Sequence, residues 1–107
     1  MIQTTATTIT VKKVLPITAT TTYVESDMHL EIVYPDNTVK WLEDTEIAFT
    51  VTNSVLDTST GEISCTGTMS GDGRYKFTIY NGTTGGAYTK IGSAYVTKFT
   101  NDTVVEV

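Results

Sequence analysis

The chain has one cysteine, Cys65, and one histidine, His29, the residue types that often form a nucleophile and its base. A catalytic cysteine acts as a thiolate and needs a base or a positive charge beside it. No sequence feature connects the two residues. Cys65 instead lies in an alternating run that puts it on the same strand face as Ile63 and Met69. We therefore expect Cys65 to pack as a small buried hydrophobe. We expect His29 to lie on the surface, next to Glu31.

Carboxylates could serve a metal ion or a hydrolase, and they gather in the middle of the chain: Glu25, Asp27, Asp36, Glu43, Asp44 and Glu46. A calcium loop needs several oxygen ligands at defined spacings, and no D-x-D-x-D or comparable pattern is present. A glycoside hydrolase needs two carboxylates that flank a sugar, and the sequence shows no groove to hold one. We expect solvated turns, no metal, no cofactor, no catalytic residue and no enzymatic activity.

Aromatic side chains are the remaining candidates for binding. Trp41 could offer a platform to a sugar, but it shares strand parity with Val39. We expect a core indole whose N–H bonds to backbone. Tyrosine is enriched in protein interfaces, and several tyrosines lie in or beside a glycine-rich hairpin. The candidate interface residues are Tyr80, Tyr88, Tyr95, Thr83 and Thr84.

The composition decides the class of fold in which these residues must lie. Twenty-four of the 107 residues are threonine, and Val and Ile add further β-branched side chains. Branching at Cβ stiffens χ1 and suits a pleated surface better than a helix. A chain of this length buries one core, so we expect a single domain over residues 1–107.

The charge and hydropathy exclude several functions. The net charge is −5, and the seven Lys and Arg are scattered, with only Lys12 and Lys13 adjacent. No basic stripe exists to neutralise phosphates, so we expect no direct binding of nucleic acid. No apolar run approaches the ~18 residues that span a bilayer, and we expect no membrane insertion. The N-terminus lacks the charged region and the apolar region of a secretory signal. We therefore expect either that the chain is used without export through the Sec pathway or that a leader was removed.

Apolar residues alternate with polar ones along most of the chain, which is the pattern of half-buried strands. Turn signals separate the runs, as in Pro35-Asp36-Asn37. We expect an all-β fold of seven to nine short strands in one antiparallel, Greek-key-like sandwich, with a small barrel as second choice. The expected strands cover residues 7–14, 18–24, 28–34, 38–43, 47–52, 63–69, 74–80 and 87–99, with a short terminal strand over 104–107.

The most specific segment runs from Ser70 to Asn81, with Asp72, Gly73 and Tyr75 at its start and Phe77 and Ile79 facing inward. It resembles the G-x-Y-x-F/Y pattern at the start of a late strand in immunoglobulin-like domains. There the glycine permits a tight entry and the tyrosine hydroxyl bonds back to the preceding connection. With the hairpin and the strand that follow, residues 70–99 are similar to the C-terminal hairpin of small β-sandwich virion proteins of tailed bacteriophages.

This resemblance implies a non-enzymatic structural protein of a virion, assembled in the cytoplasm of the host bacterium. It would be a head accessory or decoration protein, or a ring subunit of the neck or tail. Its partners would be other virion proteins or copies of itself, most simply as a homo-oligomer. The alternative is an immunoglobulin-like adhesion module of a bacterial surface protein, extracellular, that binds a protein or a carbohydrate.

Overall fold

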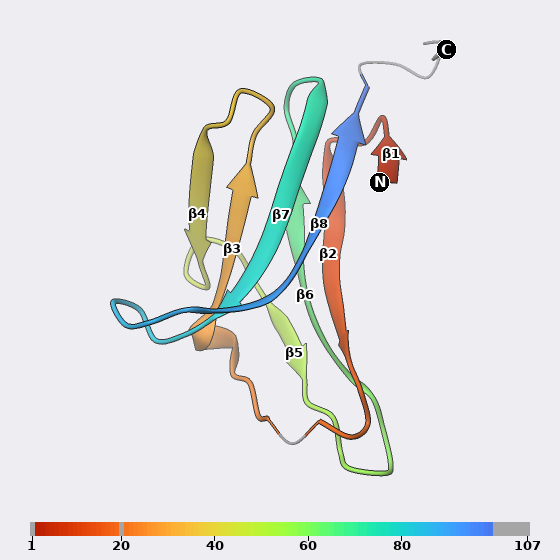
Figure 1. The fold of residues 1–107 in the computed structure, drawn as a ribbon, viewed down its shortest axis with the longest axis vertical. Coiled ribbons are helices and arrows are strands. Elements are labelled where there is room, and N and C mark those ends of the chain that lie inside the picture. The colour runs from red at the N-terminus through yellow and green to blue at the C-terminus, as the bar shows by residue number, and fades with distance from the viewer. Residues whose placement is uncertain (1, 20, 100–107) are drawn as a thin grey trace.

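The computed structural model describes residues 2–19 and 21–99, which form two β-sheets packed face to face (Figure 1). The larger sheet has the order β1-β8-β7-β3-β4, formed by Ile2–Thr4, Thr89–Lys98, Gly73–Asn81, Met28–Val33 and Val39–Glu43. The smaller sheet has the order β2-β6-β5, formed by Thr8–Leu15, Gly61–Thr68 and Thr50–Thr52. Within these described ranges, one 3₁₀ turn, η1, spans Glu25–Asp27. The all-β sandwich predicted from the sequence is confirmed, and the described strands do not close into a barrel.

The chain changes sheet at four of the connections between the described strands, β1–β2, β2–β3, β4–β5 and β6–β7. One pair departs from the antiparallel rule, because β1 lies beside β8 and runs parallel to it. The chain then crosses to the other sheet before β2 begins. The connections β1–β2, β3–β4 and β6–β7 lie at the upper end of Figure 1, the connections β2–β3 and β5–β6 extend to its lower end, and the β7–β8 hairpin projects to the left.

The inward-facing residues of β3, β6 and β7 form the core, as their alternation predicts. Each of these side chains is at most 5% exposed: Met28, Leu30, Ile32, Ile63, Cys65, Tyr75, Phe77 and Ile79. Gly67 makes room for the ring of Phe77, since a Cβ atom at this position would lie 2.5 Å from the ring. The glycine of β6 therefore lets the two sheets approach closely at this point.

Tyr75 closes the β6–β7 connection at the upper end. Its hydroxyl donates a hydrogen bond to the Gly71 carbonyl at 2.7 Å and accepts one from the Gly71 N–H at 3.0 Å. Gly73 has a φ of 128°, a conformation that suits glycine, and a Cβ there would lie 2.6 Å from Pro35. The hydroxyl bond and the glycine-dependent entry are the two features that the sequence pattern suggested.

Three strand expectations are wrong. Residues 18–24 form no strand in the part that the structure describes, because this run has few apolar side chains. The backbone of Tyr23 bonds to the side chain of Asn53 instead of to a strand. β5 starts only at Thr50, not at residue 47. In β4, Leu42 pairs with Leu30 and faces the core, so Trp41 and Val39 face outward. The strand expected at 104–107 lies outside the described residues.

Within residues 2–19 and 21–99, no helix has the length and apolar character needed to cross a membrane.

Candidate contact site

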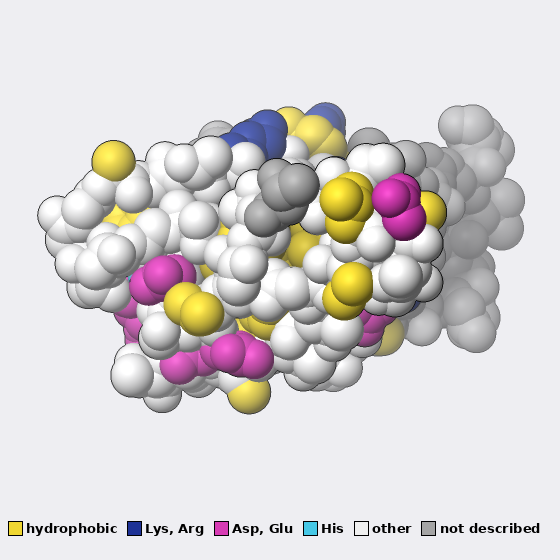
Figure 2. Space-filling model, turned by 90° about the horizontal axis from the view of Figure 1, so that it is seen from below, with side chains coloured by type: hydrophobic (Ala, Val, Ile, Leu, Met, Phe, Trp, Pro, Cys, Tyr) yellow, Lys and Arg dark blue, Asp and Glu magenta, His cyan; other side chains and the backbone are white. Residues whose placement is uncertain are grey.

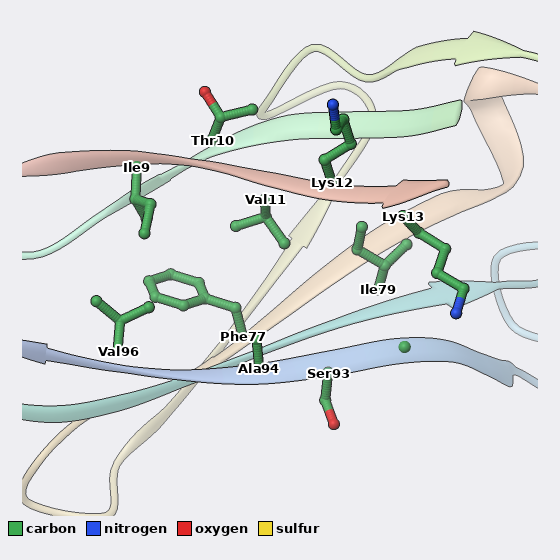
Figure 3. A pocket seen from close by; sticks show the side chains of 11 residues that line it. Ile9, Thr10, Val11, Lys12, Lys13, Phe77, Ile79, Ser93, Ala94 and Val96 are labelled. Atoms are coloured by element: carbon green, nitrogen blue, oxygen red, sulfur yellow. The ribbon is translucent and has the colours of Figure 1, made fainter. Parts of the chain in front are cut away.

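The sandwich is open along one side, between β2 and β8. A hollow of about 250 Å³ lies there, with Ile9 and Val11 on one wall and Phe77, Ala94 and Val96 on the other (Figure 3). Ala94 has the strand parity of the buried Val96 and so faces the inner side of its sheet, yet it is exposed. The inner surface of the larger sheet is therefore accessible from this side. We call this feature the open side.

Two strand edges border the open side. Among the described strands, β2 pairs only with β6, so its other edge carries no neighbour over Thr8–Leu15. β1 covers β8 only over Val96–Lys98, which leaves the edge of β8 uncovered by a described strand from Thr89 to Tyr95. An uncovered edge presents alternating N–H and C=O groups that can pair with a further strand. The open side thus combines an apolar floor with two edges able to bond to backbone.

Lysines and small residues determine what the open side can accept. Lys13 lies on the inner side of β2, with its stem near Gly92, where a Cβ atom would be 3.5 Å from Lys13 Cδ. Lys12, on the outer side, pairs with Glu62 at 3.7 Å. Charged side chains at an edge disfavour pairing with an identical edge, since like charges would meet. The geometry favours an extended segment that is apolar on one face and neutral or acidic on the other.

The structure brings two of the predicted interface tyrosines together but not the third. Tyr80 and Tyr88 pack against Trp41, with ring centroids 5.2 and 5.1 Å from the indole. Tyr95 lies on another part of the outer face, where the Arg74 guanidinium stacks 3.9 Å from the centre of its ring. Thr83 and Thr84 are exposed in the β7–β8 hairpin, and Thr84 donates a hydrogen bond to Glu43 at 2.9 Å.

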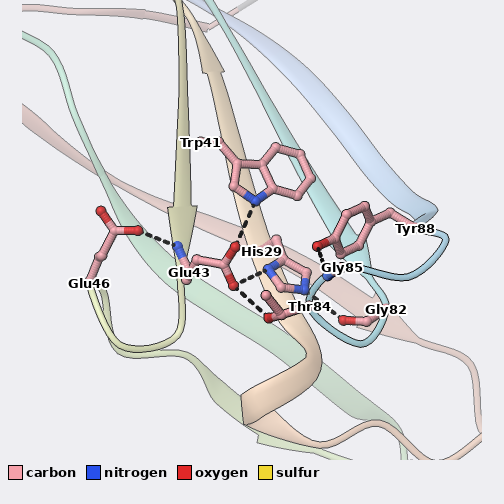
Figure 4. A network of polar contacts seen from close by, with 8 residues as sticks. All are labelled: His29, Trp41, Glu43, Glu46, Gly82, Thr84, Gly85 and Tyr88. Atoms are coloured by element: carbon pink, nitrogen blue, oxygen red, sulfur yellow. Dashed lines mark hydrogen bonds and ion pairs between the residues drawn. The ribbon is translucent and has the colours of Figure 1, made fainter.

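His29 is at the centre of this cluster (Figure 4). The prediction of a surface histidine is wrong: the side chain leaves the outer face of the sheet but is 0% exposed, because the hairpin and the aromatic rings cover it. Nε2 lies 2.6 Å from the Gly82 carbonyl oxygen, which only accepts, so Nε2 carries a proton. Nδ1 lies 3.2 Å from a Glu43 carboxylate oxygen, within ion-pair distance but not aligned for a hydrogen bond.

Trp41 corrects a second expectation. It is not a core residue, and its N–H donates to the carboxylate of Glu43 at 3.2 Å rather than to backbone. Its ring stacks on His29 with an interplanar angle of 21°. Since it also contacts Tyr80 and Tyr88, less of the indole is left to stack on a sugar. These contacts hold the β7–β8 hairpin against the larger sheet.

Cys65 is unsuited to nucleophilic chemistry. Burial raises the pKa of its thiol to about 12, so the side chain stays protonated at neutral pH. Across the described part of the chain, no three His, Cys, Asp or Glu side chains form a group that could hold a metal ion. The residues brought together here bind backbone, rings and carboxylates of this chain.

Sequence reasoning did not find the open side. One signal was present, since Lys12 and Lys13 are adjacent within an expected strand, and charges of this kind often mark an edge. A second was the Gly92-x-Ala94 spacing, which puts small residues on one face of β8. Neither shows that both edges border the same hollow.

No family model matches the chain, and no curated protein or solved structure matches it.

Proposed function

We propose that this protein is a non-enzymatic structural subunit of a tailed bacteriophage virion. It would be a head accessory or decoration protein, or a ring subunit of the neck or tail, and it would act through contacts with other proteins. The observation that carries the proposal is the open side between β2 and β8. It is an apolar hollow bordered by two edges that no described strand covers.

A site of this form suits strand addition. An extended segment of a partner pairs its backbone with the edge of β2, and every second side chain enters the hollow. Backbone bonding gives affinity and the hollow selects the side chains. Assembly through a strand needs no catalytic group, and rigid sheets hold the acceptor in shape before the partner arrives.

The virion context rests on the resemblance of residues 70–99. The hydrogen bonds of Tyr75 and the conformation of Gly73 support it, because the resemblance implies both. The thinly charged, threonine-rich surface also supports it, since such a surface hydrates well and repels neighbouring subunits weakly.

A second candidate function is adhesion to a protein or carbohydrate as a module of a bacterial surface protein. The observation in its favour is the half-buried ring cluster of Trp41, Tyr80 and Tyr88 beside an exposed hairpin. A glycan array probed with the purified protein separates the two functions. Binding that Trp41→Ala abolishes in a still-folded protein supports adhesion.

The test of the first proposal uses particles purified from a lysate of the phage that carries this gene. Ala94→Lys puts a long charged side chain into the hollow, and because Ala94 is exposed the protein should still fold. Thr66→Lys is the matched control, since Thr66 is exposed in β6 and does not line the hollow. We expect the native protein and the control in the particles, and loss of the Ala94 variant. A folded native protein that is absent from the particles would contradict the proposal.

A further inference from the structure

Large apolar side chains are exposed at the lower end of the molecule. They come from the end of β2, from the connection that follows it and from the β5–β6 connection, and they are 40% exposed (Ile17) to 56% exposed (Val55). A hydrogen bond from the Asp57 N–H to the Ile17 carbonyl, 3.2 Å long, ties the two connections together. We define the lower patch as Val14, Ile17, Val24, Val55 and Leu56.

Acidic residues accompany this patch. Glu25 follows Val24 directly, and Asp57 follows Leu56; both are exposed. Figure 2 views the molecule from this end and shows acidic and hydrophobic side chains interspersed, with basic side chains along one margin. A surface that is apolar and acidic disfavours a symmetrical contact with itself, because its carboxylates would meet.

Among the described residues, the other exposed large apolar side chains, Val39 and Tyr95, lie in one row across the outer face of the larger sheet. The strand register sets Val39 beside Val33, Val33 beside Lys76 and Lys76 beside Tyr95. Val39 is 58% exposed and Tyr95 is 41% exposed. A hollow of about 320 Å³ lies at this row, between Tyr95 and the turn that contains Pro35. We call it the Tyr95 hollow.

The Tyr95 hollow is basic, although the chain as a whole is acidic. The Arg74 guanidinium lies 3.9 Å from the centre of the Tyr95 ring, and Lys76 Nζ lies 5.7 Å from it. Both cations line the hollow. Tyrosine and arginine, which line this hollow together with Val33 and Pro35, are among the residue types that carry most binding energy in protein interfaces.

We propose that the lower patch of one copy docks on the Tyr95 hollow of the next copy. Apolar residues meet apolar residues, and Glu25 and Asp57 meet Arg74 and Lys76. The two surfaces are different parts of the molecule, so the contact is head to tail, and repetition gives a ring if it closes and a filament if it does not. This inference rests on the proposed function and names a second copy of this chain as the partner.

The experiment is sedimentation velocity of the purified full-length protein and of two charge variants, alone and mixed. Arg74→Glu/Lys76→Glu replaces the two positive charges of the hollow with negative ones. Glu25→Lys/Asp57→Asn replaces the two negative charges of the patch with one positive charge. Asn is chosen at position 57 because φ there is 62°. We expect the self-association of each unmixed variant to be weaker than that of the native chain by at least about tenfold. An equimolar mixture should recover to within about threefold, because each variant keeps one native surface and the reversed surfaces match.

The matched control is Lys40→Glu, a reversal at an exposed position outside both surfaces, which should associate like the native chain. A thermal melt of each variant establishes that it is folded. A native protein that stays monomeric at about 1 mM, or a mixture that fails to recover, overturns the inference. The inference is also overturned if only the patch variant loses association and the hollow variant associates like the native chain. In that case the patch contacts a surface other than the hollow. The particle experiment with Ala94 is independent, so a monomer found in particles refutes only the head-to-tail contact.

Discussion

His29 Nε2 lies 2.6 Å from the carbonyl oxygen of Gly82, although 53 positions separate the two residues in the sequence. This bond joins the start of β3 to the β7–β8 hairpin. Gly82 is itself held, because its N–H donates to the Asp27 carbonyl at 2.9 Å. The hairpin is therefore held by a backbone bond to η1 and by the buried imidazole of His29 in β3. We expect His29 to affect both the order of the hairpin and the stability of the domain.

His29→Ala should lower the free energy of unfolding by about 2–4 kcal/mol, because it leaves a cavity beside Trp41 and an unpaired carbonyl at Gly82. His29→Gln, which keeps an N–H donor near the position of Nε2, should lose less. Denaturant unfolding gives the energies, and amide exchange should speed up at residues 82–88 in the Ala variant. Unchanged exchange in the hairpin would refute the role assigned to this bond.

Tyr75→Phe removes the two hydrogen bonds to Gly71 and should cost about 1–2 kcal/mol of unfolding free energy. Tyr95→Phe is the control, with a change within about 0.5 kcal/mol, since Tyr95 is exposed. Both are measured by chemical denaturation. Equal losses for the two variants would mean that the corner bond does not stabilise the fold.

Gly67→Ala places a methyl group 2.5 Å from the Phe77 ring and should destabilise the domain by about 1–3 kcal/mol through overpacking. The matched substitution is Gly71→Ala, where a Cβ meets nothing within 4 Å, and we expect it to unfold much like the native chain. Adding Phe77→Leu to Gly67→Ala should cost less than the sum of the single variants. Additive losses would contradict the close contact.

Cys65 gives the protein a pH dependence at high pH. Burial raises the pKa of its thiol from 9.0 to about 12. Between these values the unfolded chain releases a proton that the folded chain keeps, so stability falls as the pH rises. Cys65→Ala should show a smaller decrease between pH 8 and pH 11 in denaturant unfolding. Native protein should also resist iodoacetamide at pH 8 and react once unfolded; rapid labelling of the folded state would contradict the burial.

The alternation of apolar and polar residues predicted the core correctly in strands where the apolar side chains occupy every second position. In β3 and β7 the residues at positions 28, 30, 32, 75, 77 and 79 could be placed inside from the sequence. β4 has apolar residues on both parities, and only its register, which pairs Leu42 with Leu30, decides that Trp41 faces outward. An edge strand exposes large side chains that would be core residues in a central strand.

The candidate site was harder to predict, because distant segments create it. His29 has the outward parity that its sequence predicts, and only the hairpin 53 residues away buries it. The open side depends on where β1 stops covering β8, and no local pattern shows this. Tyr80 and Tyr88 lie close in sequence and both pack against Trp41, whereas the ring of Tyr95 lies under the guanidinium of Arg74.

Hydrogen–deuterium exchange, compared between the free protein and the protein assembled in particles, would show directly whether the open side is where the partner binds. Strand addition predicts that amides of β2 and of residues 89–95 in β8 exchange far more slowly after assembly, while those of β5 change little. If the exchange of β2 and β8 is the same in both states, the open side is not a contact site and the proposed mode of action is wrong.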